Sequence, residues 1–67
     1  MDANVLKGHW NILKGKLKET WGKLTDDDIA EIGGKKDQLI GKLQKKYGYT
    51  KEEAAKQVDE FEESESE

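Results

Sequence analysis

The side chains suited to catalysis or metal binding are few in this chain and are not grouped. His9 is the single histidine, cysteine is absent, and no acid or serine is placed to form a catalytic pair with His9. Asp26, Asp27 and Asp28 are consecutive, so their carboxylates point in different directions, and no calcium-binding loop with a closing glutamate follows. We therefore expect no catalytic residue, no metal and no cofactor, and interpret the aspartates as negative charge at a helix N-terminus.

Lysines are a second source of candidate chemistry, because their ammonium groups can contact phosphates. They gather in two stretches, Lys14, Lys16, Lys18 and Lys23, then Lys42, Lys45 and Lys46. These stretches are compatible with binding to nucleic acid or to an anionic membrane. Against this, arginine is absent, the net charge is −3, and lysines late in a helix are favoured by the helix dipole with no ligand present. A solvated surface is the favoured interpretation.

Six glycines are spaced seven residues apart in two series, Gly8, Gly15 and Gly22, then Gly34, Gly41 and Gly48. Gly22 and Gly48 are expected to end helices in the left-handed conformation. The other four project opposite the apolar residues and, with Lys18, form a candidate interaction surface flanked by Val5 and Ile12. The alternative, which the sequence favours, is a tolerated surface that costs about 1 kcal/mol of helix stability per glycine.

The apolar residues that must position these side chains recur at helical spacing. A helix is predicted over 4–22, where apolar positions alternate four and three residues apart at Leu6, Trp10, Leu13, Leu17 and Trp21, with Leu24 following. Trp10 and Trp21 could instead lie on a membrane surface, but both fit the buried side of this helix.

Three further helices are predicted. Thr25 and Thr50 are each followed three residues later by an acid, the signature of a capping box that starts a helix. These caps predict short helices to about 31 and 62, separated by a longer helix over 34–47. Their expected buried residues are Ile29, Ile32, Leu39, Ile40, Leu43, Tyr47, Ala54, Ala55, Val58 and Phe61.

An internal repeat with an offset of 26 residues relates Leu13, Gly15 and Leu17 to Leu39, Gly41 and Leu43. We therefore expect one all-α domain over 1–62, with repeats 4–31 and 32–62 and a disordered acidic tail at 63–67. Each repeat has a single apolar face, so two tandem long-helix/short-helix hairpins must cover each other in a four-helix arrangement. We expect a monomer of marginal stability.

Composition and charge distribution limit where the protein can be located and how its surface is charged. The chain has 67 residues, no proline and no cysteine, and 40% of its residues are charged. No apolar run approaches the length of a membrane span or a signal-peptide core, so a cytoplasmic location is expected. Charge alternates along the chain in four blocks, with basic blocks at 1–24 and 35–49 and acidic blocks at 25–34 and 50–67.

Two segments, GHWNILKGKLKETWGKLTDDD at 8–28 and GKKDQLIGKLQKKYGY at 34–49, closely resemble the CsbD-like family of small bacterial proteins. The resemblance covers about residues 4–62. It implies a small helical fold, a cytoplasmic bacterial protein and expression tied to general stress. It implies no enzymatic activity, no cofactor and no agreed mechanism, so no residue roles are carried over.

The sequence thus predicts a non-enzymatic bacterial stress-response protein, acting as an interaction or protective module whose partner it does not identify. A protein partner is one possibility. The alternative is a weak binder of nucleic acid or anionic membrane through the lysine-rich long helices. An enzyme is the least supported class, because no nucleophile, base and orienting residue can be assembled.

Overall fold

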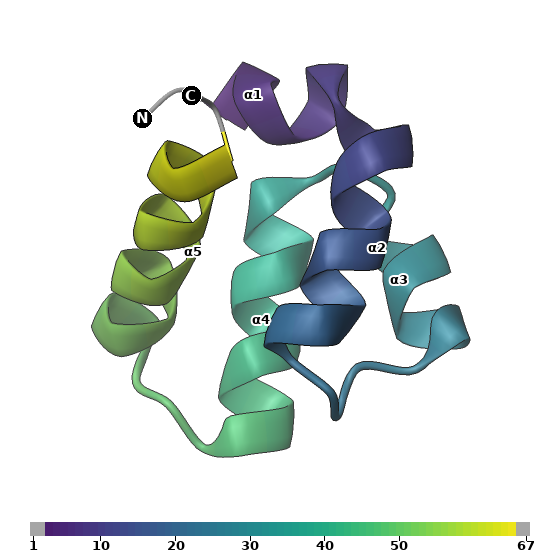
Figure 1. Cartoon of the computed structure of the whole chain (residues 1–67). Helices are drawn as coiled ribbons and strands as arrows, with labels where there is room; N and C mark the ends of the chain where they lie inside the picture. The colour runs from purple at the N-terminus through teal and green to yellow at the C-terminus, as the bar shows by residue number, and fades with distance from the viewer. Residues whose placement is uncertain (1–2, 66–67) are drawn as a thin grey trace.

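Five helices make up the described part of the chain in the computed structural model, which describes the backbone of residues 3–65 and the side chains of residues 6–64 (Figure 1). They are α1 (Ala3–Gly8), α2 (Trp10–Thr20), α3 (Asp26–Ile32), α4 (Lys36–Tyr47) and α5 (Lys51–Glu65). No strand occurs in these residues, which confirms the all-α prediction. Helix α4 lies between α5 on one side and α2 and α3 on the other, and α1 crosses one end (Figure 1).

The predicted apolar residues form one shared core, to which all five helices contribute. Leu13, Leu17, Leu39 and Leu43, at the centre of the sequence pattern, are almost completely buried. Trp10, Tyr47 and Ala55 are partly buried at its edge, and Tyr49 joins them without having been predicted. The rings of Trp21 and Phe61 lie 5.3 Å apart and connect the end of α2 to α5. The buried hydrophobic residues are Leu6, Leu13, Leu17, Trp21, Leu24, Ile29, Ile32, Leu39, Ile40, Leu43, Ala54, Val58 and Phe61.

The single helix predicted over 4–22 is wrong, because the chain breaks at His9, where φ is −119° and ψ is 24°. The turn between α3 and α4 packs against this break. A Cβ atom on Gly34 would lie 3.2 Å from the Cα of Lys7 and 3.5 Å from the Cβ of Trp10. Gly34 also has a φ of 86°, which only glycine adopts at low cost. It is therefore buried in a turn, and the helix predicted to start at 34 starts at Lys36 instead.

The helix ends follow the predicted caps in part. Thr25 closes a capping box with Asp28, and Gly48 ends α4 in the left-handed conformation with a φ of 72°. Gly22 does not adopt this conformation, because α2 has already ended at Thr20 and Trp21, with φ of −122° and ψ of 83°, has left the helical conformation. Helix α5 continues to Glu65, so residues 63–65, predicted to be disordered, are helical, while 66–67 lie outside the described residues.

Two of the observed helices follow the 26-residue offset, whereas the predicted pairing of the helices into two hairpins stays a prediction. Helices α2 and α4 begin at residues 10 and 36, which are 26 apart, and each is preceded by a shorter helix. Helix α5, predicted as a short helix, has 15 residues and is longer than α4, which has 12. The tandem repeat and its boundary at 31/32 stay predictions.

Alanine substitutions separate glycines that the fold requires from those that it does not. Gly15 and Gly41 are helical and have open space where a Cβ would be placed, so Gly15→Ala with Gly41→Ala should raise the free energy of unfolding by about 1–2 kcal/mol. Gly34→Ala should lower it by about 1 kcal/mol or more, through its positive φ and the contact with Lys7. Urea titration followed by circular dichroism measures both, and a shift of the two variants in the same direction would contradict these roles.

Candidate functional site

Two of the predicted surface glycines lie on the outward side of α1 and α2. Gly8 and Gly15 are exposed, and a Cβ atom placed on either would meet nothing within 4 Å. Between them Ile12 is 71% exposed, the one large hydrophobic side chain so exposed among the described residues. An open hollow of about 260 Å³, lined by residues 7–12, adjoins Ile12 at the helix break. These features define one surface, which we call the α2 face: Lys7, Gly8, Ile12, Gly15, Lys16 and Glu19.

The other predicted surface residues do not join the α2 face. Gly41 is exposed but lies on α4, and Gly34 is buried against Lys7 and Trp10. The ammonium of Lys18 pairs with Asp26, and this contact holds the pKa of the Asp26 carboxyl below its usual value. The side chain of Val5 lies outside the described residues. The structure therefore separates the predicted surface into the α2 face and three positions elsewhere.

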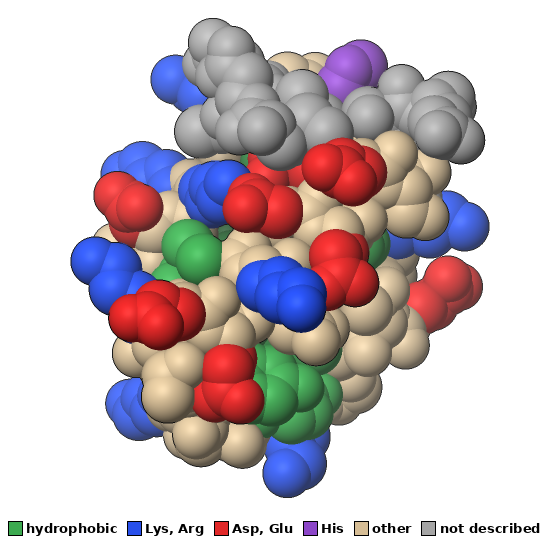
Figure 2. All heavy atoms as spheres, turned by 90° about the vertical axis from the view of Figure 1, so that its left-hand side faces the viewer, with side chains coloured by type: hydrophobic (Ala, Val, Ile, Leu, Met, Phe, Trp, Pro, Cys, Tyr) green, Lys and Arg blue, Asp and Glu red, His purple; other side chains and the backbone are tan. Residues whose placement is uncertain are grey.

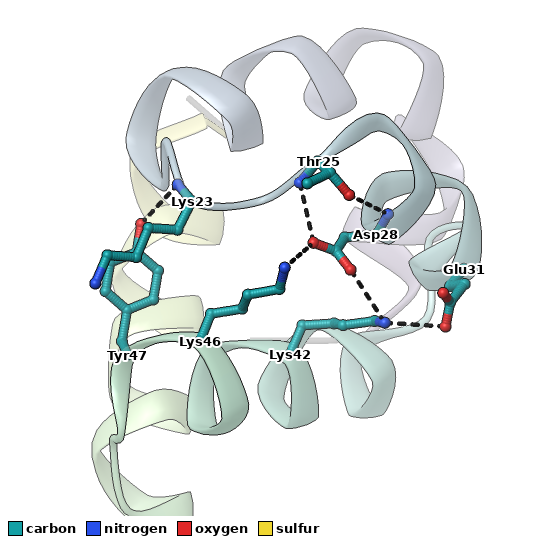
Figure 3. Close-up of polar contacts among 7 residues, drawn as sticks. All are labelled: Lys23, Thr25, Asp28, Glu31, Lys42, Lys46 and Tyr47. Atoms are coloured by element: carbon teal, nitrogen blue, oxygen red, sulfur yellow. Dashed lines mark hydrogen bonds and ion pairs between the residues drawn. The ribbon is translucent and has the colours of Figure 1, made fainter.

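Asp28 links the start of α3 to α4 (Figure 3). The Thr25 backbone N–H donates to Asp28 Oδ2 at 3.0 Å, and the Asp28 N–H donates to Thr25 Oγ1 at 3.1 Å. Lys46 and Lys42 reach its two carboxylate oxygens at 2.9 and 3.2 Å. The Thr25 backbone N–H, then Lys46, hold the pKa of Asp28 far below its usual range, although burial opposes this.

The same network occupies two of the lysines that could have contacted phosphates. Lys42 also pairs with Glu31 at 2.9 Å, so its side chain extends from α4 to two acids of α3 (Figure 3). Lys23 places its ammonium 5.0 Å from the centre of the Tyr47 ring, while its backbone N–H donates to the Tyr47 hydroxyl. In contrast, Lys7, Lys14 and Lys16 are exposed and form no ion pair with the described side chains. Lysines that are exposed without an ion pair to a described residue therefore occur on α1 and α2, and also at Lys35, Lys45, Lys51 and Lys56.

A second charged group, not predicted from the sequence, joins α5 to the start of α4. Glu62 is 0% exposed, and neither of its carboxylate oxygens receives a hydrogen bond from the described residues. Lys36 pairs with it at 3.3 Å and also with Asp59, and Asp59 is the larger cause of the raised pKa of Lys36. The sequence does contain a signal for the burial of Glu62. Glu62 follows Val58 by four residues and so lies on the apolar side of α5.

No arrangement suited to catalysis or metal binding is found among residues 3–65. His9 is exposed at the helix break, and no group of three histidine, cysteine or acidic side chains in this part of the chain could hold a metal ion. Asp26 and Asp28 point apart, as predicted: Asp26 pairs with Lys18, whereas Asp28 faces α4. Within the described residues no helix is both long enough and apolar enough to cross a membrane.

The model of the CsbD-like family matches residues 4–56, which include the capping box at Thr25 and all of α2, α3 and α4. The chain belongs to the CsbD-like family. This CsbD-like chain is 55% identical over 62 residues to the UPF0337 protein YjbJ of Escherichia coli O6:H1, covering 92% of the chain and 90% of the relative. It is 53% identical to YjbJ of Salmonella typhimurium, with 92% and 89% covered, and 49% identical to a UPF0337 protein of Protochlamydia amoebophila, with 91% and 92% covered.

The charge on Asp28 should stabilise this CsbD-like protein in a pH-dependent way. Asp28→Asn keeps an oxygen for the cap but removes the ion pairs, so it should lower the urea midpoint at pH 7, whereas the exposed neighbour variant Asp27→Asn should not. Because folding lowers the Asp28 pKa, its stabilisation is complete above the unfolded value of about 4 and is lost as pH falls below it. A gap between the two variants that persists unchanged to pH 2 would contradict this assignment.

Burial of Glu62 should limit the stability of the protein. Glu62→Leu removes a buried carboxylate while Lys36 keeps Asp59, so the free energy of unfolding should stay constant or rise by about 1–2 kcal/mol. Lys36→Met leaves Glu62 buried without its cation and should cost on the order of 3 kcal/mol. The exposed neighbour variant Lys35→Met is the control and should change stability by under about 0.5 kcal/mol. Equal losses in Glu62→Leu and Lys36→Met would refute this account.

Proposed function

We propose that this protein is a non-enzymatic, cytoplasmic stress-response protein that acts as an interaction or protective module through its α2 face. The observation that carries the proposal is Ile12, a large hydrophobic side chain 71% exposed between two glycines that leave the backbone accessible. An exposed apolar side chain next to a hollow offers a partner a contact that the core does not use. The association with stress rests on the resemblance to the CsbD-like family.

The distribution of charged groups supports an interaction role over a catalytic one. Asp28, Lys42 and Lys46 connect α3 to α4, and Lys36 connects α4 to α5. Thr50 and Glu53 satisfy each other's backbone N–H groups at the start of α5. These polar side chains hold helices together, and none of them converges with His9 on the hollow beside Ile12. The α2 face, in contrast, carries lysines that pair with no described side chain, and these are free to contact a partner.

The alternative function is weak binding of nucleic acid or an anionic membrane. The observation that supports this alternative is a pair of lysines on α2. Lys14 and Lys16 extend from α2 without an ion pair to any described residue. Because α4 commits Lys42 and Lys46 to Asp28, only Lys45 of the lysines first considered on α4 stays exposed without an ion pair to a described residue. Retention of DNA or anionic vesicles that weakens with salt and requires Lys14 and Lys16 would favour it.

A substitution at Ile12 tests the proposed function in cells. A strain that lacks its own copy of the gene is complemented with the wild-type protein, with Ile12→Ser, or with Gln57→Ser as a control at an exposed position of α5. Both variants should fold as the wild type does, because neither side chain is buried. Ile12→Ser should reduce survival after stress, and Gln57→Ser should not. Wild-type survival with Ile12→Ser, at equal protein level, would overturn the role of the α2 face.

A further inference from the structure

Helices α1 and α2 are separated by a single residue, His9. Its φ of −119° and ψ of 24° each differ by about 60° from those of an α-helix, so a change at this one residue would join the two helices. His9 is exposed, and it is visible in purple near the top of Figure 2. Its side chain forms no capping hydrogen bond, and the open hollow lined by residues 7–12 adjoins it. This break therefore has the properties of a hinge, which we call the His9 hinge.

The apolar residues on both sides of the His9 hinge are spaced for one continuous helix. Leu6, Trp10 and Leu13 are four and three residues apart, so in a straight helix they would lie on the same side. A straight helix would also pair three carbonyl groups before the hinge with N–H groups after it. In the bent structure the Ile12 N–H instead donates to the His9 carbonyl, three residues before it, at 3.0 Å. The local sequence therefore favours the straight form, and contacts with other helices must hold the bend.

Contacts with α4 and with the turn before it hold α1 in the bent position. Leu6 is 0% exposed in the shared core, and α1 packs against α4 across one end of the molecule (Figure 1). A Cβ atom on Gly34 would lie 3.2 Å from the Lys7 Cα, so the α3–α4 turn fits closely against α1. We call the Gly34 turn and the adjoining part of α4 the α1 site. In a straight helix Leu6 would lie about 10 Å along the axis from Leu13, so straightening would leave Leu6 exposed and the α1 site vacant.

The outer surface offers little apolar area for association between copies. Ile12 is the one large hydrophobic side chain with most of its surface exposed among the described residues. On the α5 side, Figure 2 shows small, separate apolar areas between acidic and basic side chains. Contact between two such surfaces would bury little apolar area, whereas an exchange of α1 between copies would form again the core contacts that each monomer already has. The α1 site of one copy therefore fits α1 of a second copy as well as it fits its own.

We propose that two copies of this protein exchange α1: the His9 hinge straightens in each copy, and α1 of each copy packs into the α1 site of the other. The exchange buries both Leu6 side chains again and adds helix hydrogen bonds at two hinges. Because the same contact is made twice, the assembly is a closed dimer with twofold symmetry. Its cost is the freedom that two molecules lose on association, so the dimer forms at high protein concentration. The proposal does not depend on the α2 face.

Two variants at His9 test whether the hinge straightens. Residue 9 lies outside the helices in the monomer but inside a helix in the proposed dimer, so its helix propensity acts on the dimer. His9→Ala should bind its second copy about thirtyfold more tightly than His9→Gly, because each dimer contains two straightened hinges. Sedimentation equilibrium over about a hundredfold range of concentration measures both dissociation constants, after a brief exposure to urea that speeds the exchange. Gly41→Ala is the control: it exchanges glycine for alanine inside α4, which is helical in both forms, and should leave the dissociation constant unchanged.

Isotope-filtered NMR of a dimer with one labelled and one unlabelled copy distinguishes exchange from surface contact. Lys7 of the labelled copy should show a nuclear Overhauser contact with Gly34 of the unlabelled copy, because the α1 site is then filled by the other chain. A dimer in which this contact stays within one copy would overturn the proposal. So would a wild type and a His9→Ala variant that stay monomeric at the highest concentration, or equal dissociation constants for His9→Ala and His9→Gly. None of these outcomes affects the proposed function, which is measured by survival with Ile12→Ser.

Discussion

The constraint that governs this structure is that every helix has only one apolar side, so the helices must share one core. None of α1, α2 or α3 can bury its apolar residues alone, and Leu6, Leu17, Ile32 and Leu43 reach full burial only where several helices meet. Helices as short as α1 and α3 are unstable in isolation, because nucleation costs more than a few hydrogen bonds return. Their stability comes from packing and from the caps and ion pairs that fix their ends.

Ion pairs join neighbouring helices around this core. Asp28 caps α3 and holds it on α4 through two lysines, which replaces part of the apolar contact that a helix of seven residues lacks. Lys36 plays a similar part between α4 and α5, but it leaves Glu62 buried without hydrogen bonds from the described residues. The two sites therefore have opposite energetic character, since a satisfied carboxylate stabilises its helix and an unsatisfied one costs free energy.

Much of the fold could be predicted from the sequence, because the spacing of leucines and tryptophans specifies which side of each helix is buried. The capping boxes at Thr25 and Thr50 are also visible as local patterns, and both are confirmed. The break at His9 could not be predicted this way, because the residues on its two sides, Lys7 and Trp10, pack against Gly34, which is 25 residues after His9. For the same reason the sequence predicts Gly34 on the surface, although its positive φ and its close neighbours require a glycine in a buried turn. The sequence predicted part of the α2 face, namely Gly8, Gly15 and Ile12. It could not predict the pairing of Lys42 with Asp28, because that pairing depends on how α4 and α3 lie in three dimensions.

The dependence of all five helices on one shared core is tested most directly by native-state hydrogen exchange. The backbone amides of Leu17, Leu43 and Val58, from α2, α4 and α5, should exchange slowest and with the same free energy, equal to that of global unfolding. Exchange at Val58 with a much lower free energy than at Leu17 and Leu43 would show that α5 opens independently, and would contradict a single cooperative core.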